Sequence, residues 1–328
     1  MRTRREFLIA IGAGLYVAAT PWAALAQPGK TWRIGFLGTE SAPATASRLE
    51  ALRAGLRDLG YVEGRNIVFE FRWADGKYDR LPGLAAELVR LNVDVLVTAG
   101  TPGVRAAKQA TTTIPIVMAA SGDAVATGLV ASLARPGGNI TGSAFFSPEL
   151  SSKRLELLKE AVPRVTQVAY FMNPGNPVAQ ANLKAMEITS RVVKVEVRQS
   201  EARGPSEFEN AFAAMARQHV DALAISQDSM ISANVGAIAD LAARHRLVSI
   251  GPTEFAAAGG LIGYGHSTLA LYRRAAYFVD RIFKGAKPAD IPIEQPTKFE
   301  MVINLKTAKA LGIKLPQAIL VRADRVIE

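Results

Sequence analysis

The chain of 328 residues contains no cysteine and only three histidines, His219, His245 and His266. Without cysteine it can form no disulfide, no thiolate metal site and no cysteine nucleophile. The three histidines lie far apart in the sequence and show no metal-ligand spacing, so no metal site is expected. His266, near Tyr264 and Asp123 in the expected topology, is the one candidate for a general base.

Common catalytic and nucleotide-binding motifs are missing as well. The loop Gly100-Thr101-Pro102-Gly103 lacks the Lys-Ser/Thr of a P-loop, and residues 27–328 contain no Gly-x-Gly-x-x-Gly fingerprint and no Gly-x-Ser-x-Gly elbow. Nucleotide binding and serine hydrolysis are therefore weakly supported. We predict no cofactor and no catalytic residue.

Long apolar runs are scarce. The run from Phe7 to Ala19 has about 13 residues, fewer than the roughly 20 that cross a bilayer as a helix. It follows Arg4 and Arg5 and precedes a small-residue stretch that ends at Ala26. This order predicts a signal peptide over residues 1–26, cleaved near Ala26. A membrane anchor or a buried N-terminal helix is the alternative.

The stretch "TRREFL" at residues 3–8 resembles a twin-arginine export signal, although the ordinary secretory route stays open. No second run is long enough to span a membrane, so we expect an exported protein in the periplasm. The net charge of +10 is scattered and forms no cluster of five or more basic residues. We therefore expect no nucleic-acid partner. The basic charge fits a solvated surface or attraction to an anionic membrane.

From Trp32 onward, short apolar runs alternate with amphipathic stretches. This rhythm predicts an α/β fold with parallel sheets covered by helices on both faces, arranged as two Rossmann-like lobes. We place the N-terminal lobe at residues 32–145 plus about 253–284. The C-terminal lobe then takes residues 146–252 plus about 285–328. Length alone also favours two domains.

Ligands of open parallel sheets bind beyond the carboxyl ends of the strands, so the residues that follow each strand are the candidates. They are rich in hydroxyls, amides and carboxylates, which suit an anionic or zwitterionic small molecule. Each one could instead be a helix cap or turn residue. Glu40 and Glu254 could form a carboxylate pair, and an aromatic wall could come from Phe145, Phe146, Phe171 or Tyr264, with Phe171 better explained as core.

Six segments carry a resemblance to a known family: residues 56–89, 119–142, "SSKRLELLKEAVP" (151–163), "FMNPGNP" (171–177), "EFAAAGGLIGYG" (254–265) and "KFEMVINLKTAKALGI" (298–313). In this order the chain, over residues 32–328, resembles the ABC transporter substrate-binding proteins of type I periplasmic-binding fold, the family that includes tryptophan- and other aromatic amino-acid-binding proteins. The resemblance implies two lobes that close on a ligand, the Venus-flytrap architecture. The ligand contacts it implies are Thr39, Thr101, Asp123, Asn173, Asn176, Asp228 and Tyr264.

The sequence thus predicts a monomeric receptor of an ABC importer. It would bind an amino acid or related carboxylate between its lobes and deliver it to an ABC permease in the inner membrane. Lipoprotein members of the family carry a lipidated cysteine that this chain lacks. A ligand-sensing protein for a membrane receptor, or an exported hydrolase that uses His266 and a nearby carboxylate, is the alternative.

Overall fold

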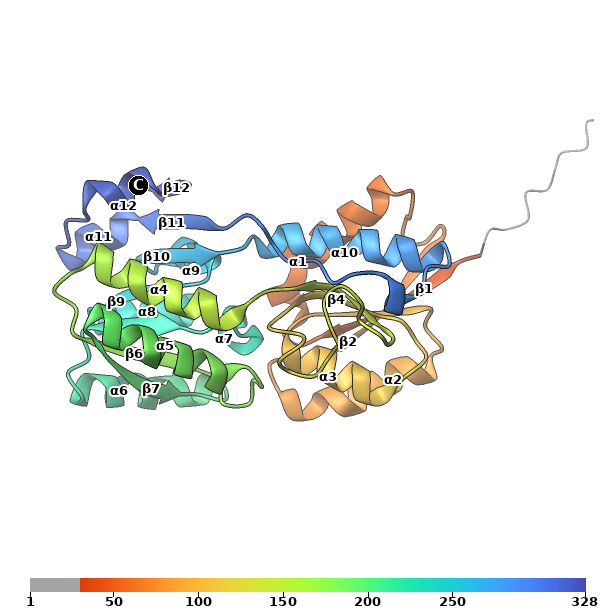
Figure 1. Ribbon diagram of the computed structural model, residues 1–328, viewed down its shortest axis with the longest axis horizontal. Coiled ribbons are helices and arrows are strands. Elements are labelled where there is room, and N and C mark those ends of the chain that lie inside the picture. The colour runs from red at the N-terminus through yellow and green to blue at the C-terminus, as the bar shows by residue number, and fades with distance from the viewer. Residues whose placement is uncertain (1–29) are drawn as a thin grey trace, which may run out of the picture. The chain divides into compact units, whose positions relative to one another are not determined.

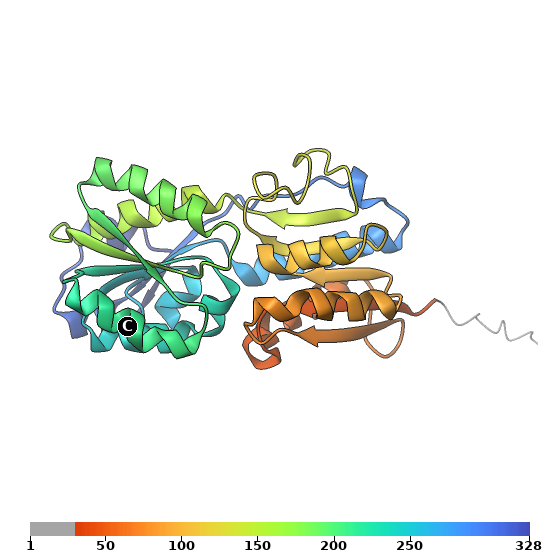
Figure 2. The ribbon, with the colours of Figure 1, turned by 90° about the horizontal axis from the view of Figure 1, so that it is seen from below.

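The computed structural model describes residues 30–328, and the predicted signal peptide lies outside this range. Within these residues two sheets form the centres of two lobes, each covered by helices on both faces (Figures 1 and 2). None of the helices described is long and apolar enough to cross a membrane. The predicted α/β fold with two sheet-centred lobes is confirmed.

The first lobe is built on a parallel sheet with the order β2-β1-β3-β4-β5. Its strands are β1 (Trp32–Gly38), β2 (Ile67–Trp73), β3 (Val95–Thr98), β4 (Ile116–Ser121) and β5 (Ile140–Ala144). Its helices are α1 (Ala42–Asp58), α2 (Leu81–Arg90), α3 (Thr101–Ala110) and α10 (Thr268–Phe283), with the short turns η1 (Tyr78–Arg80) and η3 (Pro288–Asp290).

The second lobe has the order β12-β11-β10-β9-β8-β6-β7, parallel except for the antiparallel pair β10–β11. Its strands are β6 (Gln167–Met172), β7 (Glu196–Glu201), β8 (Ala222–Ile225), β9 (Val248–Gly251), β10 (Ile262–Gly265), β11 (Glu300–Asn304) and β12 (Arg325–Ile327). Its helices are α4 (Ser147–Ala161), α5 (Ala179–Val193), α6 (Phe208–Arg217), α7 (Ser229–Ala233), α8 (Val235–Arg244), α9 (Thr253–Ala257), α11 (Leu305–Leu311) and α12 (Gln317–Val321), with η2 (Pro205–Glu207).

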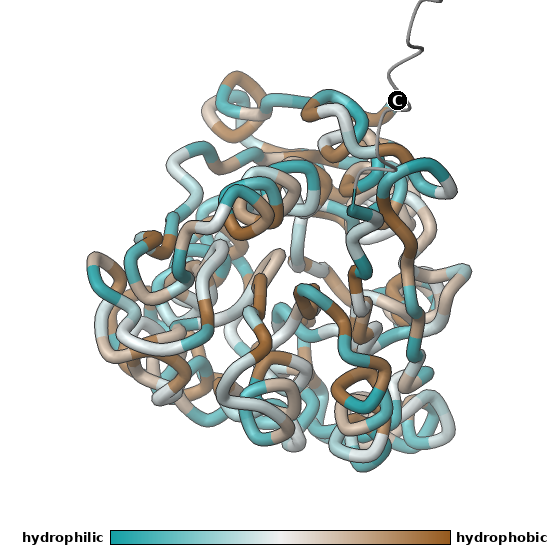
Figure 3. Tube along the Cα trace, turned by 90° about the vertical axis from the view of Figure 1, so that its right-hand side faces the viewer, coloured by the Kyte–Doolittle hydropathy of each residue, from teal (hydrophilic) through white to brown (hydrophobic). Residues whose placement is uncertain are grey.

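The continuous apolar runs of the central strands follow from burial on both faces. In β3, Val95 and Val97 belong to the core under α1 and α10, while Leu96 belongs to the core under α2 and α3. Successive side chains of a strand point to opposite faces, so a strand covered on both sides needs apolar residues throughout. Hydrophobic and hydrophilic residues alternate along the covering helices (Figure 3). In α1, for example, the buried Leu49, Leu52 and Leu56 belong to the core of the first lobe.

The chain crosses between the lobes three times. It leaves the first lobe after β5, returns between β10 and α10, and leaves again between Glu294, which bridges Ser143 of β5, and β11. The sequence placed the second crossing near residue 253 and the third near 285. The crossings lie later because β10 pairs with β9 in the second sheet, while Ile291 and Ile293 are buried in the first lobe.

One predicted element is wrong. The stretch "ATGLVASLA" at residues 126–134, whose amphipathic pattern predicts a short helix, consists of turns and bends. The Asp123 carboxylate accepts hydrogen bonds from the backbone N–H of Val125 and Ala126, which starts a helical turn. Gly128 then takes a positive φ of 69° and ends it.

The helix α10 joins the first lobe although it follows most of the second in sequence. It packs against α1, where Gly55 leaves no room for a side chain: a Cβ there would lie 2.5 Å from the carbonyl oxygen of Arg273. Large buried residues such as Phe278 complete the contact. The hinge is therefore tied to the first lobe by a helix with a mostly apolar inner face.

We predict that Gly142→Ala destabilises the first lobe. Gly142 has φ of 130°, and a Cβ there would lie 2.1 Å from the carbonyl oxygen of Met118. Strain at such a position costs about 1–3 kcal/mol before the steric clash is added. Urea unfolding should show a loss of about 2 kcal/mol or more.

The matched control is Gly138→Ala. This glycine has no atom within 4 Å of the position a Cβ would take. Its unfolding free energy should stay within about 0.5 kcal/mol of the parent value. Equal effects of the two substitutions would contradict the packing described for Gly142.

Candidate functional site

A cavity of about 50 Å³ lies where strand ends of the two lobes meet. At roughly 10–15 Å³ of such volume per water molecule, it has room for only a few. Residues of both lobes line it: Glu40, Arg48, Ala99, Gly100, Thr101, Ala120, Gly122, Phe145, Thr268 and Tyr272 from the first, and Asn176, Val178, Gln227, Asp228, Ser229, Ser232 and Glu254 from the second, with His266 on the crossing. A larger groove of about 660 Å³ borders the cavity at Arg48, Ser232, Glu254 and Thr268.

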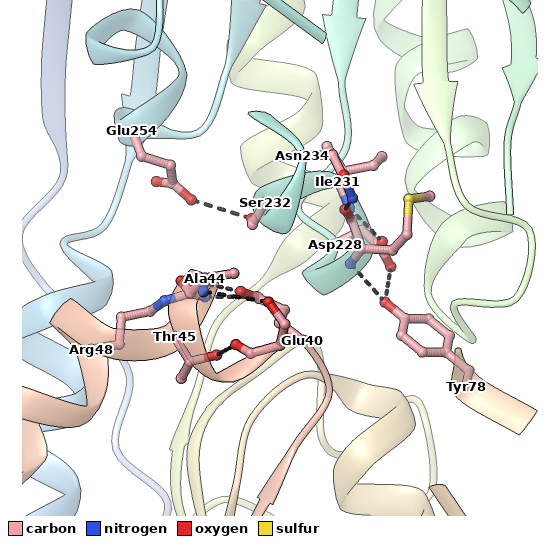
Figure 4. A network of polar contacts seen from close by, with 12 residues as sticks. Glu40, Ala44, Thr45, Arg48, Tyr78, Asp228, Ile231, Ser232, Asn234 and Glu254 are labelled. Carbon is pink, nitrogen blue, oxygen red and sulfur yellow. Dashed lines mark hydrogen bonds and ion pairs between the residues drawn. The ribbon is translucent and has the colours of Figure 1, made fainter. Parts of the chain in front are cut away.

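A tyrosine of the first lobe hydrogen bonds to a carboxylate of the second. The Tyr78 hydroxyl donates to Oδ2 of Asp228 at 2.9 Å and accepts from the backbone N–H of Met230 at 3.1 Å (Figure 4). Tyr78 lies on η1, which follows β2, and Asp228 caps α7 after β8. These two bonds hold the lobes together on the side of the cavity next to η1.

Asp228 is 4% exposed, and its carboxylate is already well supplied with donors. Besides Tyr78, the Asn176 side chain donates to it at 2.9 Å and the Ile231 backbone N–H at 3.2 Å. Burial raises the pKa of this carboxyl above its usual value, and the hydrogen bonds oppose the rise. Asp228 therefore acts mainly in closing the lobes, since little of its acceptor capacity is left for a ligand.

Glu40 and Arg48 form a buried ion pair on the first lobe. Arg48 donates with both terminal nitrogens to the Glu40 carboxylate and also to the carbonyl oxygen of Ala44 at 2.7 Å (Figure 4). Burial raises the pKa of Glu40, while Arg48 opposes the rise and Glu254 and Asp228 add to it. The predicted pairing of Glu40 with Glu254 is thus indirect: both carboxylates line the cavity, but Glu40 is neutralised by its own arginine.

Among the described residues, Glu254 is the one of these three carboxylates that accepts neither from an arginine nor from a backbone N–H. Within residues 30–328 it accepts only from hydroxyls, those of Ser232 at 3.3 Å and Thr253 at 3.2 Å. Figure 4 shows it facing Ser232 across the space above the Glu40–Arg48 pair. Its lone pairs are available to a positively charged group in the cavity.

A buried arginine lies behind the cavity wall of the second lobe. Arg154 is 2% exposed and donates to the carbonyl oxygen of Tyr264 and to Oε1 of Gln227, both at 2.8 Å. Within residues 30–328 no carboxylate lies within ion-pair distance of it. Burial lowers the pKa of Arg154 to about 10. An arginine stays charged at neutral pH even so, and the wall next to Gln227 is therefore electropositive.

His266 lies on the crossing between β10 and α10. It is 3% exposed, and its ring packs against Phe145 with the centroids 4.4 Å apart and the ring planes tilted by 40°. Neither ring nitrogen has a hydrogen-bond partner among the described residues, so the pairing with Asp123 that a hydrolase would need is not found. Burial lowers the pKa of His266 to about 4, and the charge of Arg154 contributes. The ring is neutral at pH 7.

The structure brings three of the seven predicted contacts to the cavity: Thr101, Asn176 and Asp228. Of the four others, Thr39 is buried beneath the first strand end, and Asp123 caps its own turn. Asn173 accepts a hydrogen bond from the Gly175 N–H beside a separate surface pocket. Tyr264 stacks with Phe299, with centroids 6.2 Å apart, in another pocket near the hinge.

The expected aromatic wall is made by Phe145 and, unforeseen, by Tyr272. Phe146 is exposed on the outside, and Phe171 packs against Phe208 and Phe212 in the core, as predicted. Sequence reasoning also missed Arg48, Tyr78, Arg154 and Thr268. These residues lie on helices or on η1, and no pattern separates them from ordinary surface or core positions.

Comparison with known proteins decides the family. The sequence matches the family described as ABC transporter substrate binding protein over residues 34–327. The chain belongs to this family. The family is one of substrate-binding proteins, and its fold is that of type I periplasmic binding proteins.

This substrate-binding protein is similar to the tyrosine-binding protein of Clostridioides difficile strain R20291, with 28% identity over 261 residues, or 79% of this chain and 74% of the relative. Among solved structures it is similar to a conserved domain protein from Vibrio cholerae, with 28% identity and a TM-score of 0.85. It is also similar to an ABC domain in complex with L-Trp from Streptococcus pneumoniae, with 25% identity and a TM-score of 0.82. Each of the two structural comparisons covers 90% of this chain and 100% of the solved structure.

We predict that Tyr78→Phe shifts the lobes toward an open form. A hydrogen bond to a charged group contributes about 1.5–3 kcal/mol, so the closed population should fall roughly 10- to 100-fold relative to the open one. The cysteine-free chain accepts spin labels at Arg90→Cys and Arg217→Cys, which are exposed sites on α2 and α6. Inter-label distances should lengthen in the Tyr78→Phe protein.

Tyr61→Phe is the matched control, because the Tyr61 hydroxyl bonds to Asp280 within the first lobe at 3.0 Å. It should lower stability without changing the inter-label distance. If Tyr78→Phe leaves the distance unchanged as well, the hydrogen bond to Asp228 does not hold the lobes together.

The protein should become less stable as the pH is lowered, because His266 binds a proton more readily in the unfolded chain than in the folded one. The folded pKa is about 4 and the unfolded value about 6.5, so the unfolded chain binds more protons between these values. Stability from this group is complete above pH 6.5 and is lost as the pH falls toward 4. The loss should reach about 2 kcal/mol at pH 5.

The measurement is urea unfolding at pH 7.5 and pH 5 for the parent protein and for His266→Gln. Comparison of the two proteins removes the opposing contribution of the buried carboxyls, which both contain. The variant should lose about 2 kcal/mol less than the parent. Equal losses of unfolding free energy in the parent and in His266→Gln would show that the His266 ring takes up no proton on unfolding between pH 7.5 and pH 5.

Proposed function

We propose that the protein is the periplasmic receptor of an ABC importer and that it binds an amino acid or related carboxylate between its lobes. The observation that carries the proposal is the cavity itself, which residues of both lobes line with charged groups of both signs. Closure over a ligand is how a two-lobed receptor distinguishes its loaded from its empty form.

The charges around the cavity favour a ligand with an ammonium group. Glu40 is matched by Arg48, and Asp228 and Glu254 together outweigh Arg154 by one negative charge. Because Asp228 is committed to Tyr78 and Asn176, Glu254 is the carboxylate that remains for the ammonium. A charged partner there would form a stronger hydrogen bond than the two hydroxyls do.

The relatives support an amino acid as the ligand class. One is named as a tyrosine-binding protein, and another was solved in complex with L-Trp. In this chain, Phe145 and Tyr272 supply aromatic surface at the cavity, and the groove beyond Arg48 and Glu254 gives room for a side chain. We infer that the ligand is an α-amino acid, with L-tyrosine and L-tryptophan as the first candidates.

Export and delivery complete the proposal. The sequence before Gln27 has the charged start, the short apolar run and the small-residue ending of a cleaved signal, with a twin-arginine-like start. A receptor released to the periplasm as a monomer would present its closed form to a permease in the inner membrane. That permease is the expected partner.

The first test is calorimetric titration of the purified protein, unfolded and refolded to remove bound ligand, with each of the 20 standard L-amino acids. At least one should bind. Glu254→Gln should then weaken that binding roughly 10- to 100-fold, because a hydrogen bond to a charged group is lost.

Glu156→Gln serves as control, since Glu156 pairs with Lys153 on the exposed side of α4. It should leave the affinity unchanged. Failure of every amino acid to bind, or chemical turnover of a bound one, would overturn the proposal.

A further inference from the structure

Two side chains at the hinge bring buried polar atoms to the cavity without partners. Both ring nitrogens of His266 and the hydroxyl of Thr268 lack a hydrogen bond among the described residues, and both residues line the cavity. Leaving such atoms buried and unpaired costs about 1–3 kcal/mol each. Each such group calls for an explanation, and at a cavity a bound ligand that pairs with it is one.

The adjoining wall adds a fixed donor. Arg154 has only donors, so the Gln227 atom it holds at 2.8 Å must be the carbonyl oxygen Oε1. This orientation follows from chemistry, although oxygen and nitrogen of an amide look alike. The NH₂ group of Gln227, which lines the cavity, is therefore the part left to bind a ligand, and it can only donate.

Positive charge stands behind these donors. The Arg154 guanidinium has no carboxylate within ion-pair distance in residues 30–328, and its charge acts on both His266 and Glu254. The positive and negative groups of the site are thus neighbours. In an α-amino acid the ammonium and the carboxylate are attached to one carbon, so a receptor needs adjoining acceptor and donor groups of this kind.

The α3 N-terminus is a weaker place for a carboxylate. Its first residue, Thr101, already shares a hydrogen bond with Ser121 at 3.4 Å, and Pro102 removes one backbone donor. No buried cation stands behind it in the described structure. The hinge side has the unpaired atoms, the oriented amide and the charge together.

We propose that Gln227, His266 and Thr268, with Arg154 positioning Gln227, form the subsite that binds the ligand carboxylate. The inference rests on the proposed function, since it assigns the second half of the amino-acid head group beside Glu254. Because His266 lies on the crossing between β10 and α10 and Thr268 is the first residue of α10, the ligand would contact the hinge itself.

Two variants test the subsite, because each should weaken ligand binding without lowering the stability of the ligand-free protein. Thr268→Val removes an unpaired hydroxyl, and Gln227→Glu places a carboxylate against Arg154. Neither should lower the melting temperature of the ligand-free protein. Thr268→Val should weaken binding of the amino acid found by titration, with L-tyrosine and L-tryptophan tried first, about 10-fold, and Gln227→Glu about 100-fold or more.

Ser143→Ala is the control, since the Ser143 hydroxyl is also buried and unpaired but lies away from the cavity. Its affinity should match that of the parent. A second measurement uses the parent protein alone: the amino acid should shift the NMR signals of the His266 ring and leave those of His219 and His245 unchanged.

The outcomes separate the two proposals. If no amino acid binds the parent protein, the proposed function fails and the subsite with it. If one binds and both variants bind it as well as the parent does, only the subsite is overturned. Tighter binding by Gln227→Glu would also overturn it, because the wall would then receive the ammonium.

Discussion

Closing the two lobes takes charged side chains out of water, and the structure depends on how each of these charges is then satisfied. Asp228 receives donors from its own lobe and, through Tyr78, from the other. Glu40 receives a bidentate arginine from its own lobe. The hydrogen bond from Tyr78 is available only when the lobes meet, so the closed form carries a stabilising contact that an open form lacks.

The remaining charged and polar groups at the cavity are not satisfied in this way. This difference is the reason to propose the cavity as the binding site. Glu254 has only two hydroxyl donors, Arg154 has a carbonyl and an amide oxygen, and His266 and Thr268 have unpaired atoms. A protein optimised for stability alone would have paired or replaced these groups. Their position around one small cavity is the physical reason to propose it as a receptor site, and their signs are the reason to propose a zwitterionic head group as its ligand.

The hinge combines structure and recognition. The middle crossing carries His266 to the cavity and runs directly into α10, whose first residue, Thr268, also lines the cavity. The helix α10 is anchored on α1 by tight helix packing. A ligand bound there would contact the segment on which the lobes turn. Its binding energy would then act on the equilibrium between open and closed forms without a relay through distant residues.

The sequence by itself determined the α/β class, the two lobes and the strand ends as the place of the site, because hydrophobic periodicity and the parallel-sheet rule are local and general. It also placed Thr101, Asn176 and Asp228 at the cavity and Phe171 in the core. It could not assign Asp123, which caps its own turn, or find Arg154, which resembles any arginine on a helix. The crossings near residues 266 and 295 and the contact between Tyr78 and Asp228 were decided only by tertiary structure. The crossing near residue 295 and the Tyr78–Asp228 contact depend on pairings between residues about 150 positions apart, such as Ser143 with Glu294, and no local pattern encodes such pairings.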